Sequence, residues 1–241
     1  MYFRYLHFFL ILILGTLLAA CDEPQQKKVQ NTNDLPSQEP TTIVYEDLVV
    51  KNQSDYVLIP VGISPDNNEQ REGLFSRKSN KSTNFYNIIF YNKKTKDTSL
   101  LLNKQAIIKS FNFLEIDVPP TAEQTQKTSK NFWLYRIITT DTNQDGKLDD
   151  LDATIGYISD FAGKNLIQIT PPNTQLVNWS VLPEQGEILI KLMNDSDKDL
   201  KFTDKDTINF IKVDLNKPKI GTKFINNELE QKIKSYSQQE E

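Results

Sequence analysis

Aspartate side chains are concentrated in two short stretches of this 241-residue chain. Residues 141–152 read DTNQDGKLDDLD and residues 195–206 read DSDKDLKFTDKD, so each stretch holds five aspartates in twelve residues. Carboxylate, amide and carbonyl oxygens are the ligands that calcium prefers, in sets of about six to eight at about 2.3–2.6 Å. Calcium binding is therefore the chemistry predicted for both stretches, and the alternative for the first is a solvated acidic turn between two strands.

The first stretch resembles the twelve-residue calcium loop of EF-hand proteins. The resemblance implies ligands at loop positions 1, 3, 5, 7, 9 and 12, and glycine at position 6, where the turn needs a positive φ. Gly146 holds position 6, and the closing aspartate is similar to that of dockerin loops. The implied ligands are Asp141, Asn143, Asp145, the carbonyl of Lys147, Asp149 and Asp152.

The second stretch has the same spacing but carries Leu200 at position 6. A left-handed backbone costs a residue other than glycine about 1–2 kcal/mol, so this stretch is either a weaker calcium site or a decayed repeat. Its implied ligands are Asp195, Asp197, Asp199, the carbonyl of Lys201, Thr203 and Asp206.

The segments that hold these stretches repeat. Residues 132–161 and 186–215 each contain an apolar run, an aspartate-rich loop and a second apolar run, 54 residues apart. The run FWLYRIITT before the first loop is β-branched and aromatic, so we expect each loop to join two strands. A helix–loop–helix sensor that opens on calcium binding is not expected.

Short apolar runs bounded by Asn, Asp, Gly, Lys and Pro predict an all-β domain over residues 42–225. A short helix or tail is expected at 226–241. The segment 154–193, with Asp160, Gly163, Lys164 and Asn165 in its turn, resembles part of a blade of TolB-type β-propellers. We expect antiparallel, blade-like repeats, either propeller-like or a curved array of sheets. The strands predict four-stranded groups at 87–140 and 154–193, and a third group that combines the N-terminal pair at 42–63 with the C-terminal pair.

The first 21 residues read as an export signal. Arg4 precedes an apolar stretch that is too short for a comfortable membrane span, and small residues precede Cys21. Leu18-Ala19-Ala20-Cys21 resembles the lipobox of bacterial lipoproteins, which implies cleavage after Ala20 and a diacylglycerol on the Cys21 sulfur, with palmitate among the expected chains. The alternative is a plain signal peptide (1–20). Residues 21–41 are expected to form a lipidated, disordered tether.

Composition excludes several classes of function. Cys21 and His7 are the only cysteine and histidine, so a disulfide within one chain, a Cys/His zinc site and a histidine-dependent triad beyond residue 7 are excluded. The net charge of −4 argues against general nucleic-acid binding.

We therefore expect an exported, membrane-anchored binding or accessory module of the cell envelope, with one or two calcium ions and an envelope protein or glycan as partner. Which membrane leaflet holds the anchor stays open. The alternative is a cell-envelope glycan hydrolase with convergent carboxylates, for which Glu184 and Glu187 near Trp179 are the imaginable pair.

Overall fold

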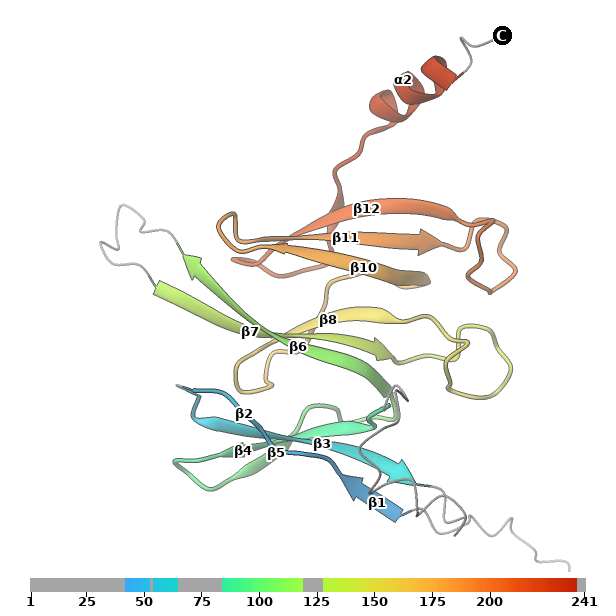
Figure 1. Ribbon diagram of the computed structural model, residues 1–241. Coiled ribbons are helices and arrows are strands. Elements are labelled where there is room, and N and C mark those ends of the chain that lie inside the picture. The colour runs from blue at the N-terminus through green and yellow to red at the C-terminus, as the bar shows by residue number, and fades with distance from the viewer. Residues whose placement is uncertain (1–41, 53, 65–83, 119–127, 238–241) are drawn as a thin grey trace, which may run out of the picture. The chain divides into compact units, whose positions relative to one another are not determined.

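The computed structural model describes residues 42–52, 54–64, 84–118 and 128–237 (Figure 1). Three antiparallel sheets account for all the described strands, which confirms the all-β, blade-like prediction. The expected signal peptide, Cys21 and the tether lie outside the described residues. No helix in the described ranges is long and apolar enough to cross a membrane.

Each sheet is built from strands that are neighbours in the sequence. Sheet A has the order β1-β3-β4-β5, with β2 also paired to β3; sheet B has the order β6-β7-β8-β9, and sheet C the order β10-β11-β12-β13. Sheet A contains β1 (Thr42–Tyr45), β2 (Val49–Val50), β3 (Tyr56–Ser64), β4 (Asn87–Asn92) and β5 (Thr98–Leu100). Sheet B contains β6 (Ile107–Val118), β7 (Thr128–Ile138), β8 (Ile155–Asp160) and β9 (Ile167–Gln168). Sheet C contains β10 (Thr174–Leu182), β11 (Glu187–Asn194), β12 (Thr207–Asp214) and β13 (Thr222–Lys223), and α2 (Asn227–Ser237) follows it.

The predicted grouping of strands is wrong, although the predicted runs coincide with the strands. Strands β4 and β5 pair with the N-terminal strands, and the C-terminal strands pair with β10 and β11. The error came from placing a sheet boundary at the first aspartate loop. That loop instead joins β7 to β8, because the apolar runs on either side of it pair with each other. Pairing between sequence neighbours is the usual arrangement in sheets.

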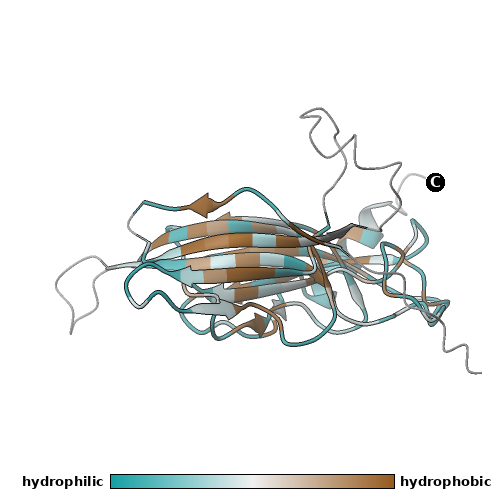
Figure 2. Ribbon diagram, turned by 90° about the horizontal axis from the view of Figure 1, so that it is seen from below, coloured by the Kyte–Doolittle hydropathy of each residue, from teal (hydrophilic) through white to brown (hydrophobic). Residues whose placement is uncertain are grey.

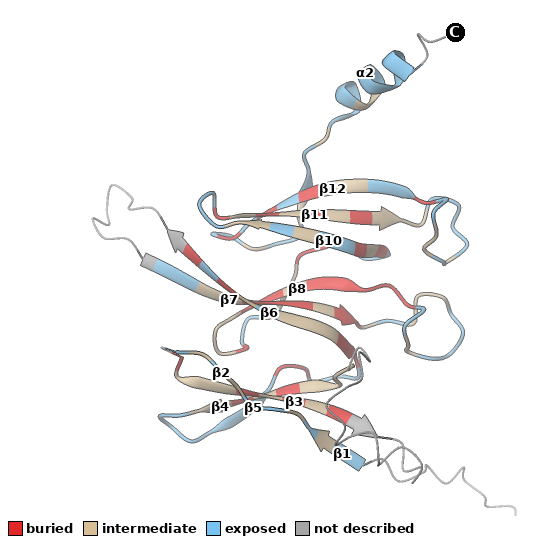
Figure 3. Ribbon diagram, in the orientation of Figure 1, coloured by how far each residue is buried: buried red, intermediate tan, exposed pale blue. Residues whose placement is uncertain are grey.

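The centre of sheet B is buried on both faces, as the red colouring of β8 and of the second half of β7 in Figure 3 shows. One face packs on sheet A around Trp133, Tyr135 and Ile137, and the opposite face packs on sheet C around Leu134 and Ile158. Alternate residues of β7 thus enter different cores, which follows from the two-residue period of a strand. Two further contacts link the sheets: an isolated bridge pairs Phe85 with Ile108, and the backbone of Thr154 bonds the start of β10.

Gly163, in the turn between β8 and β9, packs directly against sheet A. Its φ is +72°, and a Cβ there would lie well inside contact distance of the Phe90 ring. Gly146 provides a matched comparison, since its φ is +83° and a Cβ at that position would have no other atom within 4 Å.

We therefore expect Gly163→Ala to destabilise the fold far more than Gly146→Ala. Both variants adopt a left-handed backbone at about 1–2 kcal/mol, but only Gly163→Ala adds overpacking of about 1–3 kcal/mol. Thermal melting in chelator should show a fall in Tm of roughly 5–15 °C for Gly163→Ala and about 2–6 °C for Gly146→Ala. Equal falls would contradict the close packing of this turn on Phe90.

Candidate calcium loops

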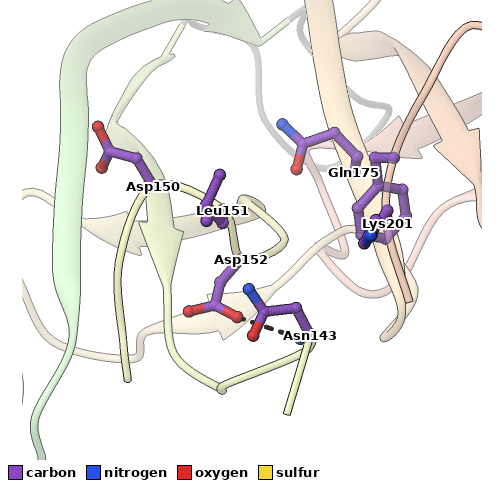
Figure 4. A pocket seen from close by; sticks show the side chains of 7 residues that line it. Asn143, Asp150, Leu151, Asp152, Gln175 and Lys201 are labelled. Carbon is purple, nitrogen blue, oxygen red and sulfur yellow. Dashed lines mark hydrogen bonds between the residues drawn. The ribbon is translucent and has the colours of Figure 1, made fainter. Parts of the chain in front are cut away.

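The two aspartate loops occupy equivalent places in successive sheets. Residues 141–152 join the second and third strands of sheet B, and residues 195–206 join the second and third strands of sheet C. Between them lies a pocket of about 310 Å³, shown in Figure 4. Side chains from both loops line this pocket, together with Gln175 at the start of β10. The loops are therefore neighbours in space as well as equivalents in the repeat.

Side-chain to backbone hydrogen bonds fold the first loop. Asp141 Oδ2 accepts a bond of 2.8 Å from the Gly146 N–H. Asn143 Oδ1 accepts one of 3.0 Å from the Asp145 N–H, and Asp145 Oδ1 accepts one of 2.9 Å from the Lys147 N–H. Such bonds are the local turns that aspartate and asparagine favour, and here they fix the side chains at positions 1, 3 and 5 on the backbone of the loop.

The second loop repeats these bonds at the same positions. Asp195 Oδ2 accepts from the Leu200 N–H at 3.1 Å, Asp197 Oδ1 accepts from Asp199 at 3.3 Å, and Asp199 Oδ1 accepts from Lys201 at 2.9 Å. Positions 4 and 6 have positive φ in both loops: Gln144 (60°) and Gly146 (83°) in the first, Lys198 (62°) and Leu200 (65°) in the second. Leu200 thus adopts the left-handed backbone in spite of its side chain, so the second loop keeps the positive φ values of the first at these two positions.

The aspartate at position 1 has one oxygen without a partner in each loop. Asp141 Oδ1 and Asp195 Oδ1 are buried and accept no hydrogen bond from the residues that the structure describes, although the other oxygen of each carboxylate is bonded. Leaving a buried acceptor unsatisfied costs about 1–3 kcal/mol, and more for a charged group. In the second loop, oxygens of Asp195, Asp197 and Asp199 also lie within 4.8 Å of one another. A cation bound in either loop would therefore neutralise the charge of a buried carboxylate oxygen.

In each loop, both carboxylate oxygens of the aspartate at position 12 accept hydrogen bonds from backbone N–H groups of the same loop. Asp152 Oδ1 accepts from the Thr142 N–H at 2.6 Å, and its Oδ2 accepts from Asp149 at 3.0 Å. Asp206 accepts at 2.8 Å from Ser196 and from Thr203, and these backbone N–H groups, Thr203 first, lower the pKa of its carboxyl. Both side chains are buried. Position 12 thus ties the two ends of each loop together, and a metal there would share oxygens that already accept hydrogen bonds.

The remaining predicted ligands lie on the rim of the loops. Lys147 and Lys201 are exposed and donate their backbone N–H groups to position 5. At position 9, Asp149 Oδ1 accepts from the Leu151 N–H at 2.9 Å, and Thr203 Oγ1 accepts from Lys205 at 3.3 Å. Among the predicted ligands of the second loop, the structure brings positions 1, 3 and 5 together.

Asp150, which the sequence did not single out, connects the first loop to the junction of sheets A and B. Its Oδ1 lies 2.7 Å from Lys109 Nζ and accepts a bond of 3.1 Å from Asn84 Nδ2. Lys109 is the extra residue of the bulge in β6, and Asn84 precedes the Phe85–Ile108 bridge. The bond with Lys109 is the main reason why the pKa of Asp150 is lowered. One sign of this contact is present in the sequence, because Asp150 directly follows Asp149 and stands at a loop position that supplies no calcium ligand.

The imagined hydrolase pair does not converge on these loops. Glu184 is exposed in the turn between β10 and β11, whereas Glu187 Oε1 accepts a bond of 3.2 Å from Lys212 on the neighbouring strand.

No family model, curated protein or solved structure matches this chain.

We expect Asp150→Asn to lower the stability of calcium-free protein modestly at neutral pH. The side chain of Asp150 is 62% exposed, so the pair with Lys109 is worth at most about 1 kcal/mol. Because the folded pKa is lowered, the stabilisation is complete above the unfolded value near 3.8 and is lost as the pH falls through the folded value. Denaturant unfolding of Asp150→Asn, Lys109→Met and the double variant at pH 7 and pH 3 measures this coupling. A coupling that grows on acidification would contradict the assignment.

Proposed function

We propose that this chain is an exported, lipid-anchored protein that binds calcium in residues 141–152 and 195–206, and that it acts through binding rather than catalysis. Calcium here is structural: it fixes the two loops at one end of sheets B and C. An envelope protein or glycan is the partner class that an anchored β-array of this kind serves.

The observation that carries calcium binding is the pair of unpartnered, buried oxygens at position 1. A lone acidic turn could orient its carboxylates toward water, so an acidic composition alone would not support a metal site. Here two loops of different sequence bury the same oxygen at the same position and hold positions 3 and 5 with the same backbone bonds. One divalent cation bound in each loop compensates the negative charge of the buried oxygen of that loop.

A structural ion fits this setting better than a sensor site. Both loops are flanked by paired strands, and β7 and β8 hold six residue pairs in register beside the first loop. The movement by which sensor EF-hands expose a groove is a change in the angle between two helices. Calcium binding here would instead stiffen the loop whose Asp150 contacts Lys109 of sheet B and Asn84 beside the Phe85–Ile108 bridge, and which is followed by the contact of Thr154 with Gln175 of sheet C.

Calcium should raise the melting temperature of the chain from Asp22 onward. At ten times the dissociation constant, one site stabilises by about 1.4 kcal/mol, which corresponds to roughly 3–6 °C for a domain of this size. Extracellular modules bind calcium at about 10⁻⁴–10⁻³ M, so the titration should extend to millimolar calcium and be compared with chelator.

Asp141→Asn should remove the calcium-dependent gain of the first loop while leaving Tm in chelator unchanged or higher. The reason is that the variant replaces an uncompensated buried charge by a neutral amide that can still accept from Gly146. Asp195→Asn tests the second loop in the same way. Asp204→Asn is the matched control, because it removes the same charge from an exposed position 10. An equal Tm with calcium and with chelator in wild-type protein would exclude calcium binding.

The lipid anchor is proposed from the Leu18–Cys21 segment alone. A single acyl chain gives marginal attachment, whereas several chains on one residue hold a protein stably on a membrane. In cells with a lipoprotein pathway, Cys21→Ser should abolish incorporation of a labelled palmitate analogue and leave the uncleaved precursor. Wild-type protein that is exported and cleaved without label would show that the segment is a plain signal peptide.

A further inference from the structure

Sheet A carries a broad apolar surface on the side that faces away from sheet B. Leu58, Ile88 and Phe90 point into the core shared with sheet B, so the alternate residues of the same strands point outward. Ile43, Tyr45, Val50 and Leu100 of this surface are 57%, 62%, 57% and 60% exposed. Figure 2 views the molecule from this side and shows the hydrophobic residues along the strands. The sheet A outer face consists of Ile43, Tyr45, Val50, Val57, Ile59, Val61, Ile89, Tyr91 and Leu100.

The strand sequences themselves indicate that something covers this face. Antiparallel strands with one solvated face alternate between apolar and polar residues, whereas strands buried on both faces read as continuous apolar runs. β3 contains VLIPV and β4 contains IIFY, so every outward position in the middle of these strands is apolar. The outer face of sheet C differs, because Lys191 and Lys212 interrupt it. The strands of sheet A thus have apolar runs typical of a sheet that is covered on both faces, although sheet A is the first of the three described sheets and packs on sheet B with one face.

The undescribed segments after Cys21 offer too little apolar surface to be the cover. Large apolar side chains in the undescribed segments 22–41, 65–83, 119–127 and 238–241 are limited to Val29, Leu35, Leu74 and Phe75. Four scattered side chains cannot cover nine that are contiguous. The apolar stretch at residues 8–19 is removed by the expected cleavage after Ala20.

Charge at the edge of the sheet A outer face weighs against a membrane as the cover. Attraction to anionic lipid requires a surplus of lysine and arginine near the surface. The loops that join the strands of sheet A carry no such surplus, and Lys94 is paired with Asp55 at 2.7 Å. The acidic residues of these loops are Glu46, Asp47, Asp55 and Asp97, and the basic residues are Lys93, Lys94 and Lys96, since Lys51 lies over the Phe113 ring of sheet B.

We infer that the sheet A outer face is the interface between two copies of this chain, each of which contributes the same face. Sheets A and B already pack face to face through such residues, and so do sheets B and C. A face without charges at its centre suits a homodimer, whose interfaces are more apolar than other protein surfaces. Nine such side chains offer on the order of several hundred Å², the scale of the roughly 800 Å² that each partner buries in a standard interface. Use of the same patch on both copies closes the assembly at two.

The test is the mass in solution of the chain from Asp22 to Glu241, which contains every described strand and the helix. Light scattering after gel filtration, at about 1–100 µM and with chelator or millimolar calcium, should give twice the chain mass in both conditions. Leu100→Glu and Ile43→Glu place a charge in the interface and should weaken the dimer at least tenfold. Ile208→Glu is the matched control, because it puts the same charge on the exposed outer face of sheet C.

Three outcomes would overturn the inference. The first is a monomer at every concentration, and the second is a dimer that survives Leu100→Glu or is lost in Ile208→Glu. The third is a monomer that co-sediments with phosphatidylcholine–phosphatidylglycerol vesicles and loses this binding in Leu100→Glu, which would assign the face to a membrane. Circular dichroism melting of each variant separates loss of the interface from loss of the fold.

Discussion

The arrangement of the three sheets depends on the burial of β7 on both of its faces. Trp133 and Tyr135 are 1% and 0% exposed on the side of sheet A, while Leu134, between them in sequence, is 1% exposed on the side of sheet C. One strand therefore contributes large side chains to two cores at every step. Because protein interiors are close-packed, neither neighbouring sheet can shift on β7 without opening a void. The sheet order, the bridge at Phe85 and the contact at Thr154 are all consistent with this central strand.

The first aspartate loop follows the end of β7, where apolar packing constrains the chain least. Apolar packing fixes the strands but leaves their ends to loops, and β7 ends at Ile138 just before the loop begins. Within the loop, the backbone is held by carboxylates that accept N–H bonds rather than by buried apolar side chains. Such a network concentrates negative charge, which repels itself unless a cation is present. The polar loop and the apolar sheets thus stabilise different parts of one repeat.

Local features of the sequence predicted most of the elements, whereas pairing between distant segments was beyond it. Runs such as NIIFY and the glycine of GKN identify strands and turns because period, β-branching and positive φ are local properties. The positions of Asp195, Asp197 and Asp199 followed from spacing, and the structure brings these side chains together. The sheet boundaries were missed because the same apolar runs can pair in several orders. The contact of Asp150 with Lys109 and Asn84 was missed because it joins residues 41 and 66 positions apart.

Leu200 shows that the two loops share a backbone conformation at position 6, although only the first loop has glycine there. A non-glycine residue at φ 65° is strained, and strain persists only where the surroundings impose it. At this position the imposed bond is the one from the Leu200 N–H to Asp195 Oδ2, which is the counterpart of the bond from Gly146 to Asp141. The second loop thus shares three features with the first: the left-handed backbone at position 6, a buried oxygen at position 1 and backbone bonds to the aspartate at position 12. These features fix the orientation of the Asp195 and Asp206 carboxylates without a glycine, because the bond from the Leu200 N–H holds the turn.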